Sequence, residues 1–159
     1  MGLTTLKIKW PNDIIHNEKK MAGILIESWL NSSGLLVVVI GIGINCRLSR
    51  AVRDSIENDA SDLYEITGRA WDRNQVIAVL LNELFLLLTE FEHSGFLSFK
   101  QEWIAYHAYQ EKPVKLIKPG NSEIFGIATG INDDGSIILL TKDGIESFVV
   151  GEISMRLSV

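Results

Sequence analysis

Cysteine and proline are scarce in this chain of 159 residues, and negative charges outnumber positive ones. The single cysteine, Cys46, can form neither an internal disulfide nor a zinc site, which favours a reducing, cytoplasmic setting. With only three prolines and no compositionally biased tract, the chain is not predicted to be mainly disordered. Fifteen Lys and Arg against twenty Asp and Glu give a formal net charge of −5. Proteins that bind nucleic acid neutralise its phosphates with basic residues, so the negative net charge argues against nucleic acid as a partner.

The chain also lacks a hydrophobic run long enough to cross a membrane. Its most apolar stretch, Val76–Phe91, is shorter than the ~18–20 residues required and is interrupted by an asparagine and two glutamates. The apolar side chains recur at steps of four and three residues, which predicts a helix over residues 73–94, capped at Asp72 and ended at Gly95. We expect this helix to be buried and the chain to have no membrane partner.

The order of patterns along the chain predicts an α+β protein in two parts. The first third alternates strand-like runs with turns, and residues 47–71 are mostly polar with one short helix near residues 61–67. A second helix is predicted over residues 96–106. From Lys112 onward, short strands alternate with Pro-Gly and Asp-Gly turns, which is typical of a small β-barrel. A domain boundary near residue 110 follows.

Two lysine-containing segments are candidates for a binding site. Lys9-Trp-Pro-Asn-Asp13 joins a cation, an aromatic ring, a proline bend and two polar side chains at the end of a predicted strand. It could direct its polar side chains toward a pocket, or it could be an ordinary turn. In Lys19-Lys-Met-Ala-Gly23, lysine is a suitable point charge for a phosphate or carboxylate, and glycine would let a ligand approach the backbone. The alternative is an exposed basic pair in a hairpin.

A third candidate, Gly41-Ile-Gly-Ile-Asn45, directly follows a continuous β-branched strand. Strand alternation places Gly41, Gly43 and Asn45 on one face, where a flat ligand could lie against bare backbone. The alternative is that glycine permits close packing of a helix. A dinucleotide-binding fingerprint is rejected because its third glycine position holds Cys46. The three histidines lie in no pairing motif, and no metal-ligand spacing is found, so no metal site is predicted.

Taken together, these segments resemble the catalytic core of biotin–protein ligases in order and spacing; they are Lys9–Asp13, Lys20–Glu27 and Val39–Asn45. Four C-terminal segments resemble the small SH3-like domain of the same family: Pro113–Ile117, Glu123–Ile127, Asp143-Gly144 and Gly151–Arg156. The resemblance implies a partial mixed β-sheet catalytic domain with packed helices over residues 1–110. A small SH3-like β-barrel over residues 111–159 would follow it.

The resemblance also implies an ATP-dependent ligase, biotin–[acetyl-CoA-carboxylase] ligase by family. Such an enzyme activates the biotin carboxylate as biotinyl-5′-AMP and releases pyrophosphate. It then transfers biotin to a lysine of a biotin carboxyl carrier protein. Biotin and ATP would be the substrates, Mg²⁺ would accompany ATP, and the carrier protein would be the acceptor partner.

Single residues match the family's motifs. Lys20 matches the essential lysine and would be the catalytic residue, because its charge neutralises the carboxylate and the α-phosphate as they are forced together. The residues implied at biotin are Lys9, Lys20, Gly23, Gly41 and Gly43. The residues implied at ATP or the adenylate are Asn12, Lys20, Asn45, Lys115 and Arg156.

One family feature is not found in its usual place. A loop rich in Gly and Arg precedes the Lys-Trp-Pro-Asn-Asp motif in this family, and here that motif begins at Lys9. We therefore expect the N-terminal half of the catalytic domain to be missing and an apolar sheet edge to be exposed. Such an edge predicts a homo-oligomer or association with a complementary N-terminal half. The alternative function is a non-catalytic remnant that acts as a protein–protein interaction or oligomerisation module.

Overall fold

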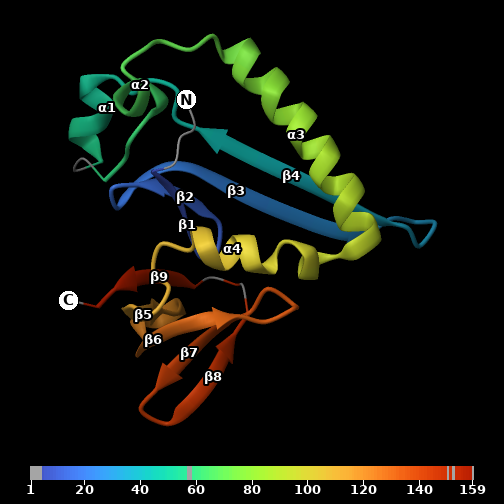
Figure 1. Ribbon diagram of the computed structural model, residues 1–159, viewed down its shortest axis with the longest axis vertical. Helices are drawn as coiled ribbons and strands as arrows, with labels where there is room; N and C mark the ends of the chain where they lie inside the picture. The colour runs from blue at the N-terminus through green and yellow to red at the C-terminus, as the bar shows by residue number, and fades with distance from the viewer. Residues whose placement is uncertain (1–4, 57–58, 150, 152, 159) are drawn as a thin grey trace. The chain divides into compact units, whose positions relative to one another are not determined.

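The computed structural model describes residues 5–56, 59–149, 151 and 153–158 (Figure 1). Val150 and Glu152, which belong to the expected C-terminal strands and motif, lie outside the described residues. The chain divides into two compact units: Met1–Leu6 with Asn12–Trp71, and Lys7–Pro11 with Asp72–Val159. Each unit is described by itself, and the predicted domain boundary at 110/111 stays a prediction.

The four-stranded sheet has the order β1-β2-β3-β4, and a long hairpin forms half of it (Figure 1). The bounds are Leu6–Lys9, Asp13–His16, Lys19–Leu30 and Leu36–Ile44. The hairpin turns at Asn31, whose side-chain oxygen accepts hydrogen bonds from the amides of Ser33 and Leu35, both at 2.9 Å. Gly34 takes the left-handed conformation that this turn requires.

The prediction of a mixed sheet is wrong for the strands that the structure describes. The β2–β3 and β3–β4 pairings are both antiparallel. Parallel contacts are confined to two isolated bridges, Ile8 with His107 and Lys20 with Ala60. The reason is that short turns join neighbouring strands here, and short turns can connect only antiparallel strands.

Two short helices occupy the polar region for which one was predicted. Helix α1 (Arg50–Ser55) begins at Ser49, and α2 (Leu63–Thr67) begins at Asp62, each with a side-chain cap on the helix N-terminus. Gly68 ends α2 in the left-handed conformation. The prediction near residues 61–67 is confirmed, and α1 is an addition to it.

The long helix α3 (Arg73–Ser94) has the bounds that the sequence predicts. The Asp72 side chain accepts a hydrogen bond from the amide of Asn74 at 2.8 Å, and Gly95 follows the last turn with a positive φ. The prediction that this helix is buried is wrong: none of its residues is buried, and Phe85 is 71% exposed. Among the described residues, no helix is long and apolar enough to span a membrane.

The helix predicted over residues 96–106 is divided. A 3-10 turn, η1 (Phe96–Ser98), precedes α4 (Lys100–Tyr106). The hydroxyl of Ser98 donates to the carbonyl of Gly95 at 3.3 Å, a local bond that favours a tight turn over a continuous helix.

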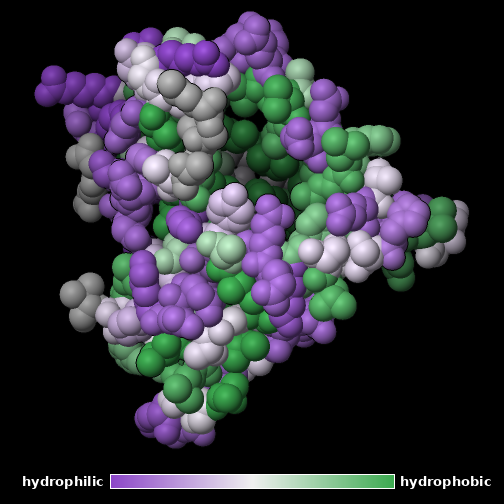
Figure 2. Space-filling view, in the orientation of Figure 1, coloured by the Kyte–Doolittle hydropathy of each residue, from purple (hydrophilic) through white to green (hydrophobic). Residues whose placement is uncertain are grey.

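The five-stranded sheet has the order β8-β7-β6-β5-β9. Its elements are β5 (Pro113–Ile117), the 3-10 turn η2 (Pro119–Asn121), β6 (Glu123–Ile131), β7 (Ile137–Thr141), β8 (Gly144–Phe148) and β9 (Ser154–Leu157). Alternate residues on one face form its core, and Val114, Leu116, Ile137, Leu139 and Met155 are fully buried. Figure 2 shows hydrophobic side chains that also reach the surface in this part of the chain.

The predicted SH3-like barrel is not closed in the part of the chain that the structure describes. β8 and β9 are the two edges of the sheet, and neither pairs with the other. The last strand instead adds to the free side of β5, with Leu116 opposite Met155. The predicted Pro-Gly and Asp-Gly turns do separate β5, β6, β7 and β8, but the last strand lies at Ser154–Leu157 and not at the predicted residues 148–150. Barrel closure depends on the long-range pairing of this strand, which turn chemistry does not determine.

A buried histidine lies beside the second sheet. His107 is 4% exposed, and its ring stacks on Trp103 with the ring centroids 4.6 Å apart. Tyr109 meets the same ring edge-on at 6.3 Å. Burial, assisted by the charge of Lys112, lowers the pKa of His107 to about 4, although the polar side chain of Gln110 opposes the shift. The folded chain therefore keeps this imidazole neutral.

We expect the free energy of unfolding to fall as the pH is lowered from about 6.5 toward about 4. In this window the unfolded chain binds a proton on His107 and the folded chain does not, so one proton contributes a slope of up to about 1.4 kcal/mol per pH unit. Urea unfolding at a series of pH values measures the slope. The slope should decrease in His107→Asn and persist in His93→Asn, which alters an exposed histidine. Equal slopes in the two variants would contradict the assignment of this pH dependence to His107.

Candidate functional site

Three glycines lie together on one face of the first sheet. Gly23 on β3 is opposite Gly43 on β4, and Gly41 is opposite Leu25. Opposite residues of an antiparallel pair share a face, so the predicted same-face placement of Gly41 and Gly43 is joined by Gly23. A Cβ built on Gly43 would come no closer than 4.0 Å to the Gly23 carbonyl, and one on Gly41 no closer than 3.5 Å to the Leu25 carbonyl.

These distances are ordinary van der Waals contacts, so packing within this chain does not require glycine at positions 41 and 43. Both residues are also exposed. The alternative from the sequence, that these glycines admit a closely packed helix, stays a prediction. The result is an exposed stretch of backbone without side chains, which suits a flat ligand.

Lys20 reaches the glycine face because β3 contains a bulge. Ile14 is opposite Ala22 and Ile15 is opposite Lys20, so Met21 has no partner on β2. Simple alternation from Gly23 would place Lys20 on the opposite face, and the extra residue reverses this. The Lys20 ammonium forms an ion pair with Asp13, which is itself opposite Gly23.

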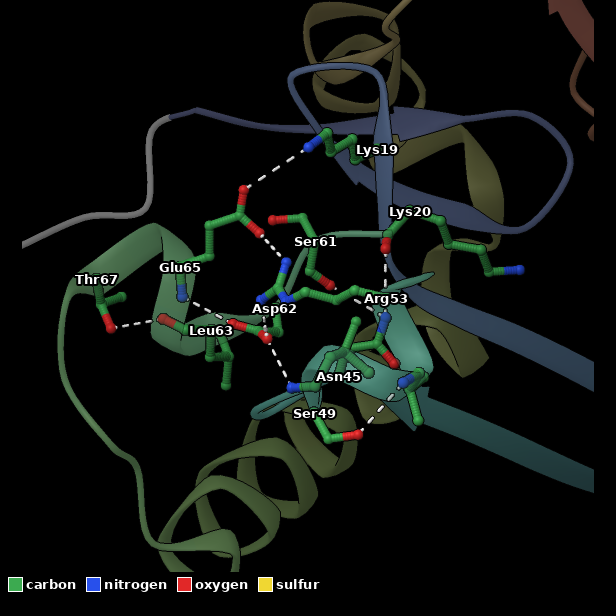
Figure 3. Close-up of polar contacts among 12 residues, drawn as sticks. Lys19, Lys20, Asn45, Ser49, Arg53, Ser61, Asp62, Leu63, Glu65 and Thr67 are labelled. Carbon is green, nitrogen blue, oxygen red and sulfur yellow. Dashed lines mark hydrogen bonds and ion pairs between the residues drawn. The ribbon is translucent and has the colours of Figure 1, made fainter. Parts of the chain in front are cut away.

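The backbone of Lys20 is held by a segment that the sequence does not single out. The Lys20 amide donates to the Asp59 carbonyl, and the Ser61 amide donates to the Lys20 carbonyl, both at 2.9 Å. The side-chain amide of Asn45 donates to the carbonyls of Lys20 at 3.3 Å and Ser61 at 3.1 Å (Figure 3). Residues 59–61 thereby connect the predicted lysine to the predicted asparagine.

A buried carboxylate fixes this segment. Asp62 is fully buried; its oxygens accept hydrogen bonds from the amides of Leu48 at 2.6 Å and Glu65 at 2.7 Å. Arg53 donates to Asp62 at 2.5 Å and to Glu65 at 2.7 Å. The hydrogen bond to Glu65, more than the charge of Asp62, raises the pKa of Arg53. In Figure 3 the Lys20 side chain points away from this cluster, so Lys20 is not part of its charge balance.

The remaining predicted residues lie on several elements. Asn12 is exposed in the turn before β2, and its carbonyl accepts a hydrogen bond from the Ile24 amide at 2.9 Å. Lys9 ends β1 and is half-buried. Lys115 on β5 is opposite Arg156 on β9, and its ammonium pairs with Glu123 at 2.7 Å. The first sheet thus unites the lysine, the glycines and Asn45, and the second sheet holds the two C-terminal cations.

Sequence reasoning missed two parts of this site. It placed Asp13 among the polar side chains directed toward a pocket but did not predict its ion pair with Lys20. An acidic residue seven positions before a lysine, across a predicted hairpin, is a usable signal for such a pair. It also assigned nothing to residues 59–62, where Asp62 begins a helix. Among the described residues, no group of three or more His, Cys, Asp or Glu side chains gathers around a possible metal position.

Comparison with known proteins gives two family matches. Residues 4–45 match the biotin/lipoate A/B protein ligase family, and residues 111–156 match the biotin protein ligase C-terminal domain. The bifunctional ligase/repressor BirA of Escherichia coli is 38% identical over 157 residues, which are 98% of this chain and 48% of that protein. The biotin–[acetyl-CoA-carboxylase] ligase of Paracoccus denitrificans is 30% identical, over 93% of this chain and 62% of that protein.

Solved structures give the same family as these sequence matches. The biotin protein ligase from Aquifex aeolicus in complex with biotin and ATP superposes with a TM-score of 0.82 at 35% identity, over 96% of this chain and 62% of that one. The two matched segments and the fold therefore place the chain in the biotin/lipoate protein ligase family. Within it, the chain belongs with the biotin–protein ligases and matches their C-terminal portion. It spans about half the length of the BirA protein that it matches.

We expect Asp62→Ala to lower the free energy of unfolding by about 2 kcal/mol or more. The substitution removes a helix cap and leaves the partly buried Leu48 amide without an acceptor. Asp54→Ala, which removes an exposed carboxylate 3.9 Å from Arg50, should change stability by less than about 0.5 kcal/mol. Urea unfolding of both variants measures the difference; equal effects would mean that Asp62 does not hold the segment.

Proposed function

We propose that this chain supplies part of the active site of a biotin–protein ligase. The reaction is ATP-dependent formation of biotinyl-5′-AMP, followed by transfer of biotin to a lysine of a biotin carboxyl carrier protein. The observation that carries the proposal is the Lys20 ammonium placed beside Gly23, which lies opposite the exposed Gly43 across the sheet. A ligand with a flat ring system and an anionic end fits such a surface.

In the first step, a biotin carboxylate oxygen attacks the α-phosphorus of ATP, and pyrophosphate leaves with the electrons of the broken P–O bond. Two anions must approach each other, and Lys20 would lower that barrier by placing a positive charge between them. In the second step, the amine of the acceptor lysine attacks the carbonyl carbon of the mixed anhydride. AMP leaves, and the amine loses a proton.

The other predicted residues have proposed places around this centre. Gly41 and Gly43 would lie under the biotin rings, since side chains there would fill the space above the sheet. Asn12 and Asn45 would face the adenylate, with the Asn45 amide already committed to two backbone carbonyls. Lys9 would lie near the biotin carboxylate. Mg²⁺ is expected on the ATP phosphates, and a cytoplasmic location stays a prediction.

Lys115 and Arg156 are proposed to contact the nucleotide from the C-terminal sheet. They are direct neighbours across β5 and β9, so an anion near one is within reach of the other. Lys115 already pairs with Glu123, and the phosphate would have to compete with this carboxylate. Replacement of Glu123 by glutamine is therefore expected to strengthen binding of an anion at Lys115.

An interaction role is also supported by a specific observation. The distal half of the β3–β4 hairpin carries apolar side chains on both faces, and Leu25, Ile26, Leu30, Leu36 and Val38 are between 48% and 69% exposed. A two-stranded ribbon with apolar residues on both faces is not stable by itself. We propose that a polypeptide equivalent to the unmatched part of the relatives covers it; a homo-oligomer is the competing outcome.

Calorimetric titration with a non-hydrolysable biotinyl-adenylate analogue tests the ligase proposal. Lys20→Ala should weaken binding roughly tenfold or more, because a charged partner of the ligand anion is lost. Lys9→Ala, titrated in parallel, shows whether the first lysine contributes equally. Absence of binding by the folded wild-type chain would remove the ligase proposal and leave the interaction module.

Gly43→Val should abolish binding of the analogue without lowering the midpoint of urea unfolding. The new side chain covers the face that the ligand would use, yet the backbone atom nearest to its Cβ is 4.0 Å away. Ser28→Val is the matched control, because it adds a β-branched residue to an exposed position of the same hairpin. Normal binding by Gly43→Val would show that the ligand does not lie on the glycine face.

Static light scattering tests the association. We expect a mass above the 17.8 kDa of one chain, reduced by the double substitution Leu30→Glu with Leu36→Glu. Ile145→Glu, which alters an exposed residue of the other sheet, should leave the mass unchanged. A single mass of 17.8 kDa over a wide concentration range would exclude the homo-oligomer, and addition of the unmatched half of a relative then tests the complementary chain.

A further inference from the structure

Asp13 and Lys20 differ in how freely they can move. The Asp13 side chain is 14% exposed and that of Lys20 is 52% exposed, although the two are paired. Asp13 lies on β2 opposite Gly23, so its position is fixed by the sheet. The carboxylate is therefore the fixed partner of the pair, and the ammonium is the mobile one.

The backbone of Lys20 cannot follow its side chain. Its amide donates a hydrogen bond to the Asp59 carbonyl, and its carbonyl accepts one from the Ser61 amide. The Asn45 side chain donates a further hydrogen bond to the same carbonyl. Any displacement of the ammonium must come from rotation about the side-chain bonds alone. The backbone of Lys20 is thus fixed, and contacts to the end of its side chain determine the position of the ammonium charge.

Gly23 provides the space in which that charge lies. A Cβ built on Gly23 would be 3.0 Å from the Lys20 Nζ, 3.1 Å from its Cε and 3.7 Å from the Asp13 Oδ1. The first two distances are tighter than most Cβ contacts in proteins, and both atoms are at the end of a flexible side chain. An alanine at position 23 would therefore shift the end of the Lys20 side chain relative to Asp13 without straining the sheet.

We propose that Asp13 is a positioning residue, which together with the absence of a side chain at Gly23 holds the Lys20 ammonium over the glycine face. This inference rests on the proposed function, because it gives that lysine a defined starting position for a carboxylate or phosphate. When such an anion binds, the Lys20 ammonium contacts it from its position beside Asp13. Asp13 keeps the Lys20 side chain directed at the ligand and does not contact the ligand itself.

The test measures the lysine and the ligand separately. In ¹⁵N-lysine-labelled protein, the side-chain ammonium signal of Lys20, assigned by its loss in Lys20→Ala, should move or broaden in Asp13→Asn and in Gly23→Ala. Asp133→Asn is the matched control: it breaks another Lys–Asp pair, with Lys100 at 2.7 Å, and should leave the Lys20 signal unchanged. Urea unfolding midpoints confirm that the variants are folded.

The same variants are titrated with the biotinyl-adenylate analogue. Asp13→Asn and Gly23→Ala should each weaken binding roughly fivefold or more, and Asp13→Glu should recover part of the loss. An unchanged Lys20 signal in Asp13→Asn overturns the positioning role whatever the analogue does. If the Lys20 signal moves in Asp13→Asn but the analogue binds equally or more tightly, the position of the ammonium does not matter for ligand binding, and the proposal is overturned. Failure of the wild-type chain to bind the analogue overturns the proposed function. The ¹⁵N spectrum still shows whether Asp13 holds the Lys20 side chain.

Discussion

The candidate site depends on the register of β3 against its two neighbours. On one side, the pairing with β4 places Gly23 beside Gly43. On the other, the bulge at Met21 turns Lys20 onto the same face and beside Asp13. A slip of one residue in the pairing with β4 would separate the lysine from Gly41 and Gly43, because it would move the side chains of β3 to the opposite face relative to β4. A slip in the pairing with β2 would separate the lysine from Asp13 in the same way.

Both ends of that register are fixed by contacts outside the sheet. At one end, the hydrogen bonds of residues 59–61 hold Lys20, and buried Asp62 with Arg53 holds that segment in turn. At the other end, the Asn31 side chain closes the hairpin turn. The long polar region between the hairpin and α3 is therefore part of the support of the site.

Local features could be predicted from the sequence, and long-range ones could not. The cap at Asp72 and the stop at Gly95 involve neighbouring residues only, so the bounds of α3 were predicted correctly. The bulge at Met21 and the pairing of β9 with β5 depend on residues far apart in sequence, and so the reach of Lys20 and the open second sheet were not predicted. The exposure of α3 was missed for a related reason: periodicity shows an apolar face but not whether anything covers it.

The uncovered hairpin has a consequence for the amount of this chain in a cell. Chaperones and proteases continuously sort chains that expose apolar surface, and Leu30 and Leu36 are each more than 60% exposed. The partner proposed above would cover this surface and so protect the chain from degradation. On the association proposed above, its abundance is set by the supply of that partner rather than by its own rate of synthesis, which couples the stoichiometry of the two polypeptides without a dedicated regulator.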